Sequence, residues 1–315
     1  MAWVTWRQHW SQAIGALGLL VALAVAALLT RLPIASAFDH DSLSACVPPA
    51  ARTGCDIIVP HFESQFGGLV TGMRVMAVLP ALAGLFVGAP LIARELEFGT
   101  YRFAWTQGVS RRRWLLSKTT LLALGTVVAA GLASLVVMWW RSPFDSLEGR
   151  IGPRGFDLEG IVVPAYALYA LALGVLAGIV FRRTVAAMTA TLVAFGATRF
   201  LVSEFIRPHF MAPLHRVISA TTTSAMPGDW VLSNTLVDGG GRQITAGREE
   251  LAVLHAQQAG IDPHTYILTL GWRRLISYQP AGRFWTFQLL EAGLFAALAF
   301  ALVLVSLWLV RRAQT

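Results

Sequence analysis

The chain has 315 residues, of which 56% are hydrophobic and only 13% carry a charge. Soluble domains usually carry about 25% charged residues, so the composition excludes an ordinary soluble domain. The formal net charge of +8 is compatible with nucleic-acid binding, but the basic residues cluster at the ends of apolar stretches. Membrane topology places basic residues there, and we therefore predict an integral membrane protein.

Six apolar segments are long enough to cross a membrane, since about 20 helical residues span about 30 Å of hydrocarbon. They predict an all-α polytopic fold, with a single transmembrane domain over residues 1–315. After the first segment, residues 35–37 read Ala-Ser-Ala, like a signal-peptide cleavage site. The apolar run before them is longer than a usual signal core, so we expect a retained span. The expected spans are 13–30, 68–92, 115–140, 161–181, 185–206 and 285–310.

The distribution of basic residues predicts the orientation. If the N-terminus is cytoplasmic, the inside segments hold 11 basic residues in 44, whereas the outside segments hold 12 in 134. We therefore expect a plasma-membrane protein with both termini in the cytoplasm. A large outside segment, 207–284, then separates the last two spans. Within it we expect an amphipathic helix at 248–258 and a turn at 238–241.

Glycine and proline spacing predicts details of helix packing. Pro80 and Pro90 should bend the second span. Small residues four apart allow helices to approach closely, and we interpret three such pairs as packing contacts. The pairs are Gly68 with Gly72, Gly84 with Gly88, and Gly174 with Gly178.

Cys46 and Cys55 both fall in the first outside segment. An even number of cysteines outside the cytoplasm favours a disulfide, and two separate thiols are the alternative. The histidines form no H-E-x-x-H motif, and the chain has no G-x-S-x-G sequence and no Cys/His nucleophile pattern. We therefore predict no metal site, no catalytic residue and no cofactor in this chain.

Four ionisable residues fall within the expected spans: Arg74, Arg199, Glu204 and Glu291. Charges in hydrocarbon are expensive, and they usually face the interior of a bundle or a cavity. Helix rise places Arg74, Arg199 and Glu291 at a similar depth in the outer leaflet, with Glu204 nearer the surface. Mutual pairing is one interpretation, and side chains that reach up to the headgroups are the other.

The basic residues include a single lysine, Lys118, which lacks glycine at the positions before it that a P-loop requires. A phosphate-binding P-loop requires G-x-x-x-x-G-K-[ST], so this chain cannot form one. If the protein uses ATP, another chain must hydrolyse it.

The inside segment 93–114 is the only sizeable cytoplasmic surface that the sequence predicts. It mixes acids, aromatics and arginines, as a docking surface does. Three arginines, 111–113, follow the expected N-cap Ser110 and oppose the helix dipole. Attraction to anionic lipid or to an acidic partner explains them, and a plain positive-inside anchor is the alternative. That anchor does not explain the run 95–107.

With this segment, the chain resembles the permease subunits of ATP-binding-cassette (ABC) transporters, of the ABC type-2 or type V exporter class and of actinobacterial type. Motifs that carry the resemblance lie along the whole chain in the expected order. They are Trp-Arg-Gln-His at 6–9, the run 93–107 with 110–114, Arg-Pro-His at 207–209, Asp-Trp-Val-Leu-Ser at 229–233, Tyr-Gln-Pro-Ala at 278–281 and Arg-Phe-Trp at 283–285.

The resemblance implies two permease copies and two separate ATP-binding subunits that carry ATP and Mg. It also implies a coupling segment at 93–114 with an acidic element, Glu95-Leu96-Glu97. Because positions two apart lie on different faces of a helix, we expect one acid to meet the ATPase and the other to contact the permease's own arginines. The implied coupling residues are Arg94, Glu95, Glu97, Gly99, Thr100, Arg102, Trp105 and Gln107.

We therefore expect an exporter permease for a hydrophobic or amphipathic substrate, such as a lipid, a peptide or a hydrophobic antibiotic. The alternative is a receptor or scaffold in the membrane, whose outside segment 207–284 binds a ligand and signals through partners.

Overall fold

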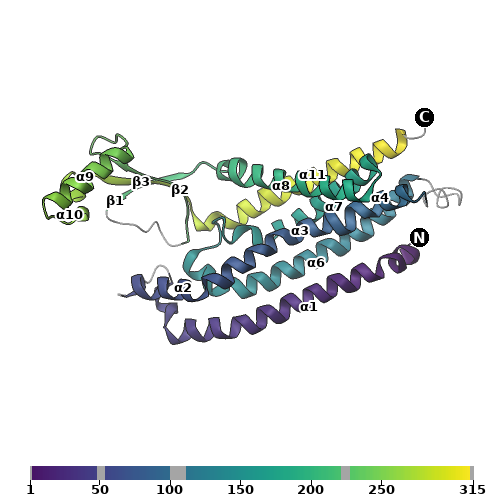
Figure 1. The fold of residues 1–315 in the computed structure, drawn as a ribbon, viewed down its shortest axis with the longest axis horizontal. Helices are drawn as coiled ribbons and strands as arrows, with labels where there is room; N and C mark the ends of the chain where they lie inside the picture. Colours follow the sequence, from purple (N-terminus) through teal and green to yellow (C-terminus); the bar gives the residue numbers. More distant parts are fainter. Residues whose placement is uncertain (1, 48–53, 100–110, 221–227, 313–315) are drawn as a thin grey trace.

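The computed structural model describes residues 2–47, 54–99, 111–220 and 228–312. Figure 1 shows an elongated bundle of long helices with a smaller module at one end. Within the described residues, six helical segments are long and apolar enough to cross a membrane, which agrees with the predicted multi-pass helical protein. These segments are Ala13–His40, Ile57–Glu97, Leu115–Glu148, Val162–Phe181, Thr184–His209 and Ala281–Arg312.

The first two spans are longer than the sequence indicated. Helix α1 runs over Ala2–His40, and α2 over Cys55–Met73, so much of the expected loop 31–66 is helical. Ile34 and Phe62 are completely buried in a cluster against α6. Burial of these apolar side chains stabilises the extra turns. The sequence prediction missed these turns because it used only the number of residues needed to cross the hydrocarbon.

The second span changes helical type twice near its prolines. A 3₁₀ segment, η2, covers Arg74–Val78 just before Pro80, and a π-helical segment, η3, covers Ala83–Gly88 just before Pro90. Proline has no N–H to donate to the preceding turn, and its ring crowds the carbonyl there. The remaining helical parts of this span are α3, Leu79–Leu82, and α4, Ala89–Glu97.

Helix α7 lies at the centre of the bundle and contacts α4, α6, α8 and α11. Its sequence is apolar on all sides, as a helix surrounded by others requires. A short turn at Arg182, in the left-handed region with φ 55°, joins it to α8 as an antiparallel hairpin. The bounds are α6 Arg111–Glu148, η4 Phe156–Leu158, α7 Val162–Phe181, α8 Thr184–Leu201, the π-helical η5 Val202–Ile206, η6 Arg207–His209, η7 Ala281–Arg283 and α11 Phe284–Arg312.

Two of the three predicted glycine pairs pack against each other. A Cβ on Gly174 would lie 2.5 Å from the carbonyl oxygen of Gly84, and one on Gly88 would lie 2.6 Å from that of Leu171. The second and fourth spans therefore touch backbone to backbone, which only glycine permits. The third pair, Gly68 and Gly72, differs, since a Cβ at either position would meet nothing within 4 Å.

The segment between the last two spans corrects the all-α prediction, because it contains a three-stranded antiparallel sheet in the order β1-β3-β2. In its register, Val217 of β1 and Thr235 of β2 both face Leu275 of β3. The strands pair over long sequence distances, so a local sequence pattern does not predict the sheet. The module comprises β1 Leu214–Ser219, β2 Trp230–Val237, α9 Ala246–Gln258, α10 Pro263–Thr269 and β3 Arg273–Gln279.

Two local predictions for this module are confirmed. Helix α9 contains the expected amphipathic helix 248–258, and its Ala252 and Ala256 are buried. The backbone N–H of Gly241 donates to the Asp238 carbonyl over 2.9 Å, closing the expected turn. We refer to residues 210–220 and 228–280 below as the outer module, after the side of the membrane that the sequence predicts for it.

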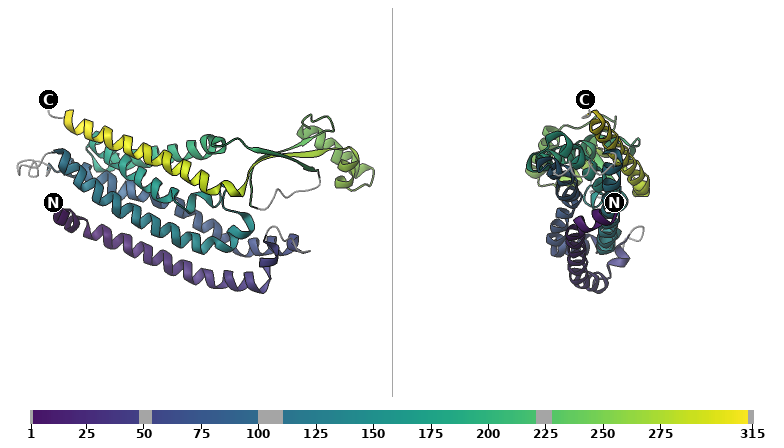
Figure 2. Two further views of the ribbon diagram at one scale, coloured as in Figure 1. Left: turned by 180° about the vertical axis from the view of Figure 1, so that it is seen from behind. Right: turned by 90° about the vertical axis from the view of Figure 1, so that its right-hand side faces the viewer.

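The two ends of the bundle carry different parts of the chain. Figures 1 and 2 show both termini at one end of the long axis, and α9 and α10 at the other. Helix α4 ends on the side of the termini, whereas α2 begins on the side of the outer module (Figure 1). The even number of candidate spans in the described residues is consistent with this shared position of the termini.

Candidate functional site

A network of buried charges joins α7, α8 and α11 near the outer module. Arg207 lies at its centre and donates to both carboxylate oxygens of Glu291, from Nε over 2.6 Å and from Nη2 over 2.8 Å. The same Nη2 also donates to Asp157 of η4. Arg199 of α8 completes the network, with 3.1 Å to Glu291 and 2.9 Å to Asp157.

Tyr166 of α7 adds a neutral donor and an aromatic surface to this network. Its hydroxyl donates to Oε1 of Glu291 over 2.6 Å, and the Arg199 guanidinium lies 3.6 Å from the centroid of its ring. Glu291 and Arg207 are 0% and 1% exposed. Two cations therefore balance two anions in a buried site, which is the condition under which buried charges are tolerated.

Asp157 belongs to the segment between the third and fourth spans, and the network fixes its charge. Burial alone would raise the pKa of Asp157, but the guanidinium groups of Arg207 and Arg199 outweigh burial and hold this pKa below its usual value. Asp157 is therefore ionised at neutral pH.

A second group of charges lies beside the first, at the end of α6. Arg141 Nη2 is 3.0 Å from Asp145, Arg150 Nη2 is 3.1 Å from Glu159, and Arg141 Nε is 3.6 Å from Glu159. Arg141 and Glu159 are fully buried. Burial raises the pKa of the Glu159 carboxyl, against the attraction of Arg150 and Arg141.

Gln288 of α11 forms hydrogen bonds to the backbone of the segment that contains both Asp157 of the first group and Glu159 of the second. Its side-chain oxygen accepts from the backbone N–H of Val162 over 3.1 Å, and its amide donates to the carbonyls of Phe156 and Glu159, each over 3.1 Å. One buried side chain thus satisfies three backbone groups. Gln288 and Glu291 lie almost one turn apart on α11, so this one helix contacts both the backbone of this segment and the arginines of the first group.

The structure brings together two of the four predicted intramembrane charges, Arg199 and Glu291. Arg74 and Glu204 are both exposed, and neither forms an ion pair within the described ranges. The principal partners, Arg207 and Asp157, were not predicted, because the topology count assigned them to outside segments. Arg207 directly follows the expected end of the fifth span. This position next to the span was the one feature of the sequence that indicated a place in the network.

At the opposite end of the bundle, both acids of the Glu95-Leu96-Glu97 element contact their own chain. Glu95 forms an ion pair with Lys118 of α6. Glu97 accepts from both the backbone N–H and the hydroxyl of Thr184, over 3.0 Å and 2.7 Å. These contacts are with a lysine and a threonine, and the charge of Arg183, next to Thr184, also acts on Glu97.

The other predicted coupling residues fall into two groups. Arg94 is exposed at the end of α4, next to Phe98, which is 70% exposed, and Gly99 adopts φ 69°. A positive φ at Gly99 ends the helix at no steric cost. Thr100, Arg102, Trp105 and Gln107 lie outside the described residues.

A family model described as "ABC-2 membrane transporter related" matches residues 17–207. The chain belongs to this family. The match covers more than half of the chain. It includes the second, third and fourth spans and most of the first and fifth. It also includes the acidic element of α4 and both arginines of the buried network. Comparison with curated proteins and with solved structures finds no match. The chain is thus a multi-pass membrane subunit of the ABC-2 type.

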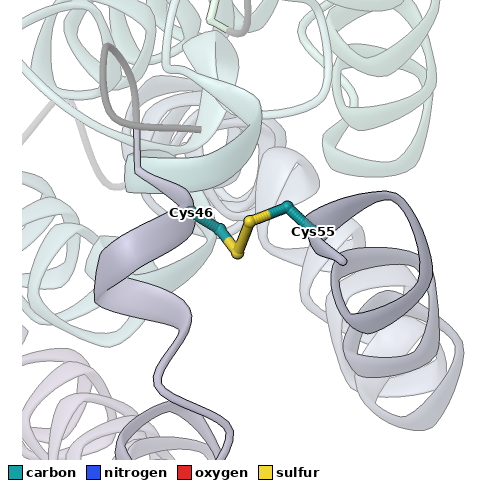
Figure 3. The surroundings of a disulfide bond; sticks show 2 residues. All are labelled: Cys46 and Cys55. Carbon is teal, nitrogen blue, oxygen red and sulfur yellow. A yellow bond between two sulfur atoms is a disulfide. The ribbon is translucent and has the colours of Figure 1, made fainter. Parts of the chain in front are cut away.

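The end of this ABC-2 subunit at which the sheet lies also carries a disulfide. Cys46 and Cys55 are bonded, with their Cα atoms 5.6 Å apart, and join η1, Leu43–Cys46, to the start of α2 (Figure 3). The disulfide that the sequence predicts is therefore present. No group of three or more His, Cys, Asp or Glu side chains able to hold a metal ion occurs within the described residues.

Proposed function

We propose that this ABC-2 subunit is the permease of an ATP-driven exporter. It pairs with a second copy of itself and with two copies of a separate ATP-binding subunit, which carries the ATP and Mg. Family membership supports the transporter role. The absence of a P-loop around Lys118 supports a separate ATPase, because nucleotide phosphates need that backbone cradle.

The bonds at the end of α4 are the observation that carries the coupling proposal. Glu95 ties α4 to α6 through Lys118, and Glu97 ties α4 to the first residue of α8 through Thr184. Arg94 and Phe98 are exposed beside these contacts. An ATPase that docks beside Arg94 and Phe98 would therefore displace three helices at once.

The proposed orientation has both termini and the end of α4 in the cytoplasm. The higher density of basic residues in those segments supports it. The disulfide supports it independently, because Cys55 begins α2 at the end where the outer module lies (Figure 1). Disulfides persist in oxidising compartments, so this end belongs outside the cytoplasm.

The substrate that we propose is hydrophobic or amphipathic. Large apolar side chains are exposed along α1, α6 and α8, among them Leu29, Leu124 and Val193. Such a substrate reaches the protein from the bilayer without leaving an apolar medium, whereas a small polar solute would need a hydrated path.

Purification of the tagged chain from the membranes of its own cells tests this function. We expect an ABC ATP-binding protein in equal amount, identified by mass spectrometry, and ATP hydrolysis only in fractions that contain it. A chain that purifies without such a partner, under conditions that keep it folded, would overturn the proposal and favour the receptor or scaffold.

A further inference from the structure

Arg31 is a half-buried cation of α1, and its partners carry no charge. Its Nη1 donates to the Trp140 carbonyl over 3.1 Å, and its guanidinium lies 5.0 Å from the centroid of the Trp139 ring. Within the described ranges, Arg31 forms no ion pair, and its Nε and Nη2 have no hydrogen-bond partner. A carbonyl and a ring orient a guanidinium without cancelling its charge. The edge that remains is the one that binds an oxyanion through two parallel bonds.

Two neighbouring helices hold this guanidinium in place. Trp140 of α6 is completely buried, and its indole N–H donates to the Thr30 hydroxyl of α1 over 2.8 Å. Thr30 directly precedes Arg31, so this bond fixes the two helices against each other at the level of the guanidinium. An arginine that only reaches up to headgroups keeps its rotamer freedom until it binds. Arg31 is already held, so an anion meets a preorganised group.

The depth of Arg31 is that of lipid headgroups. At about 1.5 Å per residue, Arg31 lies roughly 27 Å along α1 from Ala13, where the first candidate span begins. The hydrocarbon is about 30 Å thick, so the guanidinium lies near its boundary on the side of the outer module. Helix α1 lies at the edge of the bundle against α6 (Figures 1 and 2). Lipid therefore has access to this pair of helices.

The two helices expose apolar side chains in line with Arg31 and Trp139. Leu28 precedes Arg31 by three residues, Leu135 precedes Trp139 by four, and both leucines are exposed. Residues three or four apart are neighbours on one helix face. The cationic site thus continues into an apolar surface within the bilayer. This arrangement suits a molecule with an anionic head and acyl chains, whereas a free anion gains nothing from the apolar part.

We propose that Arg31 and Trp139 bind the phosphate group of a lipid in the leaflet on the side of the outer module, with its acyl chains along α1 and α6. The guanidinium donates charge-assisted hydrogen bonds to the phosphate oxygens. The Trp139 ring, 47% exposed, forms one wall of the site. The inference goes beyond the proposed function and does not depend on ATP-driven export, because a receptor in the same membrane would keep the site.

Lipid binding by the full-length, detergent-purified chain tests this site. Native mass spectrometry compares the affinities for phosphatidylglycerol and for a neutral galactosyl diacylglycerol with the same acyl chains. We expect Arg31→Ala to weaken phosphatidylglycerol binding about tenfold and to leave galactolipid binding unchanged. Arg74→Ala is the matched control, since Arg74 is an exposed arginine of the second span with no ion pair within the described ranges. It should change either affinity by less than about twofold.

Trp139→Leu gives a second measurement that keeps Arg31 and its bond to Trp140. The replaced side chain is half-exposed and the new one is apolar, so the fold should persist. We expect phosphatidylglycerol binding to weaken about threefold, because the guanidinium loses its aromatic contact. Excess inorganic phosphate should not displace the lipid. Unchanged phosphatidylglycerol binding in both variants, an equal loss of the galactolipid, or displacement by phosphate alone would each overturn the inference.

Discussion

Glu97 at the end of α4 accepts hydrogen bonds from both the backbone N–H and the hydroxyl of Thr184, the first residue of α8. A carboxylate at a helix N-terminus satisfies a donor that has no partner within the helix and interacts favourably with the helix dipole. The last residue of α4 is thus part of the N-terminal cap of α8.

Replacing Glu95 and Glu97 together by Ala should leave membrane insertion intact, since the change does not weaken the positive-inside signal. Transport, and the effect of the permease on its partner's ATP hydrolysis, should fall several-fold. Thr184→Val should lower both in the same direction, because it removes one of the two bonds to Glu97 and leaves the acid in place. Transport assays of reconstituted complexes measure this.

Glu250→Ala, on α9, is the matched control for these acids. Arg31→Ala is not suitable, although its position at the end of the first expected span suggests a neutral site. Arg31 donates to the Trp140 carbonyl over 3.1 Å and lies 5.0 Å from the Trp139 ring. Full transport and normally regulated ATPase activity in the Glu95/Glu97 variant would show that these acids do not couple.

Arg207→Ala should destabilise the subunit by about 3–5 kcal/mol, because it leaves the two anions Glu291 and Asp157 with Arg199 as the one remaining cation of the network in a buried site. Arg207→Lys should recover only part of the loss, since an ammonium cannot make the two parallel bonds to Glu291. Thermal unfolding of the detergent-solubilised protein, followed by size exclusion, measures both. Arg216→Ala, exposed on β1, should change stability by less than about 0.5 kcal/mol, and a similar loss at both positions would contradict the network's role.

Stability should depend on pH through Glu159. Its pKa is raised by burial, so the folded state holds this proton more tightly than the unfolded state. That contribution is complete below the unfolded pKa, about 4.3, and is lost as pH rises through the folded pKa. Asp157 has the opposite sign, and its contribution is lost only as pH falls below its ordinary pKa.

Glu159→Gln should flatten the fall in melting temperature as the pH is raised from about 4.3. The slope is the useful quantity, because Gln also changes the contacts to Arg141 and Arg150 at every pH. Identical slopes for the wild type and the variant would mean that another group carries the pH dependence.

Cys46→Ser should cost about 2–3 kcal/mol of local stability, since the disulfide restricts the unfolded chain. Differential scanning of oxidised and reduced protein should show the same difference. Mass spectrometry of non-reduced peptides that found two free thiols would rule the bond out.

The orientation can be read from labelling of single cysteines. Gly240→Cys, in the turn of the outer module, should react with an impermeant thiol reagent from outside intact cells. Phe98→Cys, highly exposed at the end of α4, should react only after the membrane is opened. The reverse result would place the coupling segment outside and exclude an ATPase there.

Hydrophobicity and glycine spacing predicted the parts of the fold that one segment determines alone. The six spans follow from apolar length, and the seam between Gly84 and Gly174 follows from small residues four apart. Arg199 and Glu291 were correctly placed together because helix rise gives depth. The sheet around Leu275, and Asp157 in the network, depend on segments that return to the bundle from far along the chain. A local sequence pattern does not indicate which distant segments come into contact.

The backbone seam between the second and fourth spans has a consequence for motion. Side chains between helices can change rotamer and let the helices slide, but Gly84, Gly88, Gly174 and Gly178 provide none. We therefore expect these two spans to move together as one rigid unit. The movements of transport are then expected at the contacts that this pair of spans makes with the other helices.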